Sequence, residues 1–244
     1  MKLVTISRTV LSAVTVLALL GAATQSTAGS STPPVPRSYD VPPVAQSSVR
    51  VLTNLILNGD FENSTFTPGC NFNQSNASIT AGLANITAYG AATEIDEMSN
   101  GTSCGFAGPP QSGTVKLAIH RQSVGGSTDE FSFLLSSAVV AGTAYDISFY
   151  SWSDLSFDPD VGWVEIGLSS SAASFGTLAF SGTSGTTGWV LSSGTFTAPV
   201  NATYLTARVT ASAEAWIHID NFTLELATVP VEDLTWGGIK EMYK

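Results

Sequence analysis

The chain has 244 residues, of which 43% are hydrophobic, and it carries 9 Lys and Arg against 19 Asp and Glu. It is therefore long enough and apolar enough to build a hydrophobic core, which excludes a disordered chain. A net charge of −10 argues against a nucleic-acid partner, because that binding requires basic residues that neutralise phosphates. The composition favours a secreted all-β protein.

Residues 1–28 are typical of a secretory signal peptide. Lys2 and Arg8 form a basic start, Val10–Leu20 is an apolar run, and small residues at 26–28 offer a cleavage site. The apolar run is shorter than the roughly 20 residues that a membrane-spanning helix needs. We therefore expect cleavage rather than anchoring, no transmembrane span, and a protein that is secreted or at the cell surface.

A Pro- and Ser-rich linker is predicted over residues 29–50, because this stretch has no apolar period. A β-sandwich domain is predicted over 51–227, where short alternating runs are separated by Gly, Ser, Thr and Asn. A C-terminal tail, 228–244, follows. The predicted strands are Leu55–Leu57, Val115–Ile119, Phe131–Leu135, Tyr145–Trp152, Trp163–Leu168, Gly194–Ala198, Tyr204–Val209 and Trp216–Leu226. Eight such strands suit an all-β jelly roll.

Strand alternation assigns side chains to two faces. If Ile147 and Phe149 enter the core, Tyr150 and Trp152 face the other way. The same parity turns a set of aromatic and polar residues away from the core on the later strands. This set comprises Trp163, Glu165, Arg208, Trp216 and His218.

Residues 62–113 are rich in Asn, Gly, Thr and Ser and predict long surface loops. They contain Cys70 and Cys104, the only two cysteines. In an exported protein an even pair is expected to form a disulfide, and neither cysteine has a Cys or His neighbour at metal-ligand spacing. Closure of this loop is expected to contribute roughly 3 to 4 kcal/mol.

Four landmarks along the chain resemble galactose-binding-like jelly rolls, especially the carbohydrate-binding modules of families 4, 9 and 22. The first, Asn54–Glu62, resembles the opening strand of that family. The others are Gln111–Leu117, Val139–Phe149, and Trp189–Pro199 followed by Ile219–Leu224. The resemblance covers about residues 52–227 and implies the fold, whereas function depends on the site. The long insertion that holds the cysteines departs from the family pattern.

The resemblance implies a structural calcium ion between an acid on the first strand and an acid on the last. Glu62 and Asp220 match those positions. The alternative is that the two acids accept hydrogen bonds from loop amides or form a salt bridge. Asp154, Asp158 and Asp160 also lie close together, but without the Gly and terminal Glu of an EF-hand loop they favour a solvated turn.

A sugar-binding site needs flat aromatic surfaces flanked by hydrogen-bonding groups. If the strands that carry them share one sheet, the outward residues would form such a surface. Candidate stacking residues are Tyr150, Trp152, Trp163 and Trp216, and candidate hydrogen-bonding residues are Glu165, Arg208 and His218. The alternative is that some of the aromatic residues cover a second core beneath a loop.

The sequence thus predicts a secreted, non-catalytic module that binds a glycan or polysaccharide. An alternative function is a cell-surface or extracellular-matrix adhesion protein that uses the sandwich for assembly and the tail for attachment. A small hydrolase is a third, weaker interpretation, since the sequence has no Gly-x-Ser-x-Gly elbow and only two histidines, His120 and His218. His120 follows a predicted strand, where a surface role is expected.

Overall fold

The structure is a computed structural model that describes residues 53–99, 104, 108–123, 126–156, 158 and 160–228. These residues all belong to the second of the two units into which the chain divides, Val49–Lys244. The predicted signal peptide and linker lie outside the described residues, as does the predicted tail beyond residue 228.

The described residues form eleven strands and one short helix. In chain order these are β1 (Cys70–Gln74), α1 (Asn76–Gly82), β2 (Ile86–Ala88), β3 (Ile95–Met98), β4 (Lys116–Arg121), β5 (Glu130–Val139), β6 (Ala144–Ser153), β7 (Trp163–Ser169), β8 (Thr177–Ser181), β9 (Val190–Thr197), β10 (Ala202–Thr210) and β11 (Ala215–Leu226).

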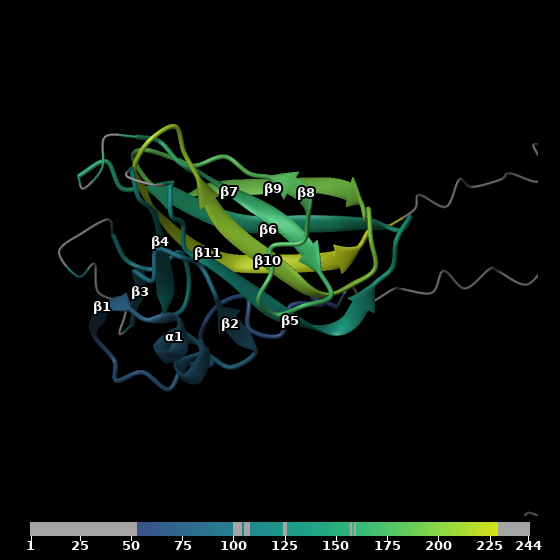
Figure 1. The fold of residues 1–244 in the computed structure, drawn as a ribbon, viewed down its shortest axis with the longest axis horizontal. Coiled ribbons are helices and arrows are strands. Elements are labelled where there is room, and N and C mark those ends of the chain that lie inside the picture. The colour runs from purple at the N-terminus through teal and green to yellow at the C-terminus, as the bar shows by residue number, and fades with distance from the viewer. Residues whose placement is uncertain are drawn as a thin grey trace, which may run out of the picture. The chain divides into compact units, whose positions relative to one another are not determined.

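The strands pair into two antiparallel sheets that pack face to face (Figure 1). The six-stranded sheet has the order β1-β3-β4-β11-β6-β9, and the five-stranded sheet has the order β2-β5-β10-β7-β8. Long antiparallel strands with one face on the core and one face outward are typical of a sandwich. The predicted all-β jelly-roll sandwich is confirmed.

The core lies between the two sheets and contains Ile147 and Phe149, which strand parity assigns to it, together with side chains of β11. Ile147, Phe149, Ile217 and Ile219 are all 2% exposed or less. Five phenylalanine rings from the first landmark, β5, β6 and β11 meet at its centre. Each buried side chain of this size contributes about 1.5–3 kcal/mol through removal from water.

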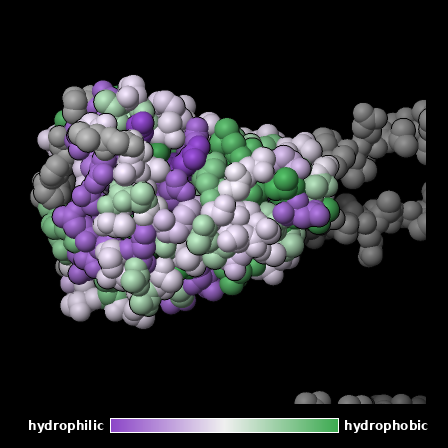
Figure 2. All heavy atoms as spheres, viewed as in Figure 1, coloured by the Kyte–Doolittle hydropathy of each residue, from purple (hydrophilic) through white to green (hydrophobic). Residues whose placement is uncertain are grey.

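The prediction of long surface loops over 62–113 is wrong, because β1, α1, β2 and β3 all lie in this range. The side chains of β3 are buried on both faces, so the strand has no alternating pattern to reveal it. In contrast, the predicted strand Leu55–Leu57 is not one of the described strands, although Ile56 makes an isolated bridge to Leu135 and Leu55 hydrogen-bonds to Leu224 and Ser136. On the face drawn in Figure 2, hydrophilic residues gather over the end that carries α1, β1 and β3.

The predicted disulfide is confirmed: Cys70 on β1 is bonded to Cys104, with their Cα atoms 5.7 Å apart. It ties the edge strand of the six-stranded sheet to the chain segment that leads into β4. The one helix in the described part of the chain, α1, has seven residues and begins at the N-cap Ser75. It is too short to span a membrane.

A bulge interrupts β11 between Asp220 and Thr223, where the register with β6 shifts. Asn221 adopts a φ of 54°, in the left-handed region. Before the bulge Ile217 and Ile219 enter the core, and after it Phe222 and Leu224 do so. The inserted residue therefore changes the core-facing positions of the strand from odd-numbered to even-numbered residues.

Candidate functional site

A pocket of about 240 Å³ lies on the outer face of the six-stranded sheet. It is lined by Phe72, Asn73, Asp96, Met98, Ala118, Asp154, Trp216 and His218. We call it the Trp216 pocket. Strands β1, β3, β4 and β11, which are neighbours in the sheet, supply most of the lining, and Asp154 follows β6.

The register of the strands explains why the sheet is hollowed here. Asp96 on β3 is paired with Ala118 on β4, Ala118 with His218 on β11, and His218 with Trp152 on β6. These four residues form one row across the sheet. Because the alanine has only a methyl group, it leaves space between its larger neighbours, and this space becomes the floor of the pocket.

Trp216 provides the flat apolar surface of the pocket, and His120 fixes its position. The two residues are cross-strand partners, and their rings stack with centroids 4.4 Å apart and an interplanar angle of 5°. His120 is itself only 4% exposed, so its predicted surface role is wrong. A half-buried indole held in one orientation can present a stacking surface without losing further side-chain entropy.

His218 is the principal hydrogen-bonding side chain in the pocket. Its Nε2 lies 3.3 Å from Oδ2 of Asp154. Burial lowers the pKa of His218, so the ring is neutral near pH 7. If Nε2 carries the proton and donates to Asp154, Nδ1 is an acceptor, and it has no hydrogen-bond partner among the described residues.

Asp96 stands on the other side of the pocket floor. Its Oδ1 accepts a hydrogen bond of 2.7 Å from the backbone N–H of Asn73. Burial raises the pKa of Asp96 to about 7, and the nearby charges of Asp129 and Glu94 act in the same direction. Near neutral pH this carboxyl can therefore either donate or accept a hydrogen bond.

Trp152 and Tyr150 lie on the same sheet as the Trp216 pocket but do not line it. Trp152 is half-buried and contacts Trp189 edge to face, at a centroid distance of 6.1 Å. A Cβ added to Gly108 would come within 3.1 Å of the Trp152 ring, so a loop covers part of it. Trp152 therefore fits the alternative in which an aromatic residue lies beneath a loop and does not form an open stacking surface.

Trp163, Glu165 and Arg208 lie on the other sheet, on β7 and β10. The condition that the strands of all seven candidate residues share one sheet is therefore not met. Glu165 and Arg208 are cross-strand partners and form an ion pair with an N–O distance of 2.6 Å. The Arg208 guanidinium also lies 3.9 Å from the centre of the Phe175 ring, so these polar groups are engaged with each other and with the protein.

The three aspartates after β6 were expected to form a solvated turn, and this is wrong for two of them. Asp154 and Asp158 are 6% and 8% exposed. Asp154 faces His218 in the Trp216 pocket, and Asp158 lies near His120. Asp160 accepts a hydrogen bond from Ser212 at the surface. The sequence spacing could not reveal which strands these side chains would meet.

Glu62 and Asp220, the predicted calcium ligands, both accept hydrogen bonds from the loop that precedes β4. Glu62 accepts from the N–H groups of Thr114 and Val115 at 2.7 and 2.8 Å. Asp220 accepts from backbone N–H groups at 111 and 112. N–H groups are not cation ligands, so these surroundings fit the alternative of hydrogen bonding to loop amides rather than calcium. Calcium binding itself stays an untested prediction.

We expect Glu62→Gln to lower the free energy of unfolding by about 1–2 kcal/mol, because charge-assisted hydrogen bonds to the loop become weaker. Thermal unfolding of both proteins in EDTA and in calcium chloride measures this effect. Asp60→Asn, on the same segment, is the control and should change little. A Tm that rises with calcium in the parent chain but not in Glu62→Gln would instead establish the calcium site.

Sequence reasoning found Trp216 and His218 but missed the other wall of the Trp216 pocket. Phe72, Asn73, Asp96 and Met98 come from the insertion that was expected to form loops. The signal that could have found this wall is the run Ile95–Met98, in which two acids stand between apolar residues.

No family model matches the sequence, and no curated protein matches it. Several solved structures are similar. The CBM22-1 xylan-binding domain of Xyn10C from Paenibacillus barcinonensis is 12% identical with a TM-score of 0.41, over 67% of this chain and 99% of that one. The N-terminal cellulose-binding domain of Cellulomonas fimi β-1,4-glucanase C is 19% identical with a TM-score of 0.39, again over 67% and 99%.

A larger enzyme is also similar over part of its length. The arabinose-bound MgGH51 α-L-arabinofuranosidase is 16% identical with a TM-score of 0.47, and the match covers 72% of this chain but only 27% of that one. Likeness at these identities concerns the fold alone, since one fold carries many functions. The function of this chain therefore depends on the geometry of its own site.

Proposed function

We propose that this chain is a carbohydrate-binding module that takes a sugar ring of a glycan or polysaccharide in the Trp216 pocket. The observation that carries the proposal is an indole held flat by His120 in a pocket that also contains hydrogen-bonding groups. A pyranose has apolar C–H faces and polar hydroxyls at its edge. The indole matches the faces, and His218, Asp96 and Asp154 match the hydroxyls.

The size of the Trp216 pocket sets the length of ligand that it encloses. Its volume of about 240 Å³ lies below the roughly 300–1,000 Å³ of pockets that enclose drug-sized molecules. It therefore suits one sugar unit, with the rest of the glycan outside. Affinity should be modest, since only interactions that exceed the cost of immobilising the ligand contribute to binding.

The proposed setting is extracellular and non-catalytic. The Cys70–Cys104 disulfide supports an oxidising compartment. Both acids in the Trp216 pocket have protein partners: Asp154 faces His218, and Asp96 accepts from Asn73. We therefore expect binding without turnover. Release of reducing ends from a polysaccharide panel, lost in Asp154→Asn, would instead support a hydrolase.

We expect Trp216→Ala to weaken glycan binding at least about tenfold, since loss of one stacked aromatic residue removes upwards of ~1.4 kcal/mol. Affinity electrophoresis and calorimetry on a panel of soluble polysaccharides measure this. Trp163→Ala is the matched control, because this half-buried tryptophan lies on the opposite sheet, and its affinity should equal that of the parent chain.

Two outcomes would contradict the proposed site. If Trp163→Ala loses binding and Trp216→Ala keeps it, the ligand binds on the five-stranded sheet. If the parent chain binds no glycan but self-associates in analytical ultracentrifugation, the adhesion and assembly function is favoured.

A further inference from the structure

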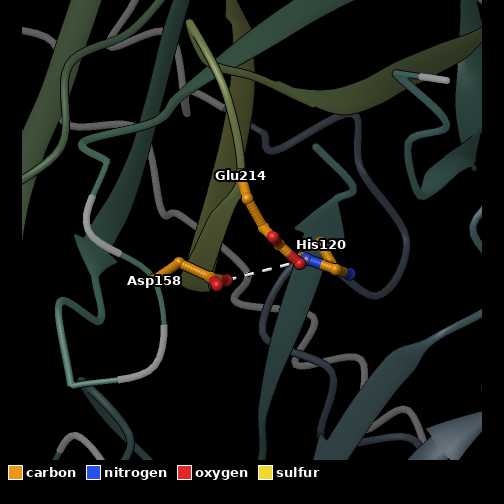
Figure 3. A group of neighbouring side chains, drawn as sticks. All are labelled: His120, Asp158 and Glu214. Carbon is orange, nitrogen blue, oxygen red and sulfur yellow. Dashed lines mark ion pairs between the residues drawn. The ribbon is translucent and has the colours of Figure 1, made fainter. Parts of the chain in front are cut away.

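A second cluster of chemical groups lies next to the Trp216 pocket, at the edge of the His120 ring that stacks on Trp216. His120 on β4, Asp158 from the segment after β6, and Glu214 from the turn between β10 and β11 converge on one point (Figure 3). His120 Nε2 lies 3.3 Å from Oε1 of Glu214 and 3.6 Å from Oδ2 of Asp158. Three segments far apart in sequence thus place one nitrogen and two carboxylates together.

The other ring nitrogen of His120 is held by a carboxylate. Nδ1 lies 2.6 Å from Oε2 of Glu94. Asp129, which is fully buried, accepts hydrogen bonds from the backbone N–H groups of both His120 and Glu94. With Nδ1–H donated to Glu94, Nε2 carries a lone pair at the edge of the ring that faces Asp158 and Glu214. A carboxylate behind the ring is the usual support of a metal-binding histidine.

Two inner atoms of this cluster have no hydrogen-bond partner among the described residues. The His120 side chain is 5% exposed, and neither its Nε2 nor Oδ2 of Asp158 has a hydrogen-bond partner in the described part of the chain. The Glu214 oxygen, at 3.3 Å, does not lie where a ring N–H would donate to it, and the Asp158 oxygen, at 3.6 Å, is beyond hydrogen-bond distance. Buried acceptors that face one another are costly unless a positive charge lies between them.

We propose that His120 Nε2, Asp158 and Glu214 bind a divalent transition-metal ion of the zinc class. Ligand atoms about 2.0–2.1 Å from a tetrahedral Zn²⁺ are about 3.3–3.4 Å from one another. The separations of the two carboxylate oxygens from Nε2, 3.3 and 3.6 Å, agree with this geometry. In such a site the other ligands lie away from the axis of the ring nitrogen, which also explains why these oxygens make no hydrogen bond to Nε2.

The ligand set selects the class of metal. An imidazole nitrogen suits zinc and its neighbours, whereas Ca²⁺ and Mg²⁺ require a shell of oxygens. Three protein ligands leave a fourth position for water or an external ligand, as in zinc sites that are not purely structural. His120 also stacks on Trp216, so an ion at Nε2 would hold the ring that supports the wall of the sugar pocket.

The test is titration of chelator-treated full-length protein with Zn²⁺, followed by calorimetry and tryptophan fluorescence. We expect one Zn²⁺ per chain and a fluorescence change from Trp216, whose indole contacts the liganding ring. Glu214→Gln and Asp158→Asn should each weaken Zn²⁺ binding at least tenfold. Glu94→Gln, which acts through the histidine, should weaken it about 10–100-fold. Glu214 lies in a turn and is partly exposed, so that variant should fold.

Asp160→Asn is the matched control, two residues from Asp158 but bonded to Ser212, and it should bind Zn²⁺ as the parent chain does. The proposal is overturned if Zn²⁺ does not saturate a single site, if Ca²⁺ binds equally well, or if Glu214→Gln and Asp158→Asn bind unchanged. A fluorescence change that follows pH alone, identical with and without Zn²⁺, would mean that the cluster holds only a protonated histidine. None of these results depends on glycan binding.

Discussion

Phe222→Ala is expected to lower the free energy of unfolding by about 3–5 kcal/mol, the range for truncation of a buried aromatic residue. Phe222 is 1% exposed. Its ring stacks on Phe149 at 4.9 Å and contacts Phe133 at 5.0 Å and Phe61 at 6.1 Å. Rings from three other segments would all border the cavity left by the substitution, and such a site cannot collapse without moving both sheets.

Urea unfolding, followed by circular dichroism, measures this loss. For a domain of this size the same change corresponds to a Tm lower by about 2–4 °C for each kcal/mol. Leu178→Ala is the control, because Leu178 on β8 is 49% exposed and its loss should cost less than about 0.5 kcal/mol. Equal effects from the two substitutions would contradict the central position of Phe222.

Replacement of both cysteines by serine is expected to cost about 3–4 kcal/mol of unfolding free energy. The disulfide closes a loop with a sequence separation of 34 residues, and its loss restores that loop's entropy to the unfolded chain. The bond also holds β1, an edge strand whose one partner among the described strands is β3. Since β1 carries Phe72 and Asn73 of the Trp216 pocket, glycan affinity should fall as well.

The reduced parent chain is the natural comparison for this double variant. Dithiothreitol should lower the Tm of the parent chain to that of the variant and leave the variant unchanged. If the variant keeps the stability of the oxidised parent, the closed loop contributes nothing and β1 is held by its pairing with β3 alone. If the double variant shows the full expected loss of stability but keeps the glycan affinity of the parent chain, the disulfide is not needed to position the β1 wall of the Trp216 pocket.

The sequence predicted the strands that have one face on the core and one face outward. Alternation over 144–153 and 202–210 indicates a period of two, and Phe149, which it assigns to the core, is buried, as is Leu205. Strand β3 has both faces covered, so alternation cannot identify it. Strand β8 lies at a sheet edge with largely exposed side chains, and it also lacks the pattern.

The site was predicted only in part because parity says which side of a strand a residue faces, not which sheet the strand joins. Trp163 and Trp216 are both outward, yet their strands lie in different sheets. The cluster at His120 could not be predicted from the sequence for a related reason. Its members come from β4 and from two connections whose ends are brought together only by sheet order, and none has a ligand partner nearby in sequence.

The bulge at Asn221 has a consequence for how the last strand tolerates change. Upstream of it the odd-numbered residues Ile217 and Ile219 are interior, and downstream the even-numbered Phe222 and Leu224 are. If this single residue were deleted, only one half of the strand could keep its native pairing. In the other half, the apolar side chains would turn outward and the outward side chains would turn toward the core. Insertions and deletions in the strand should therefore be excluded by selection, while the left-handed position itself accepts Gly, Asn or Asp.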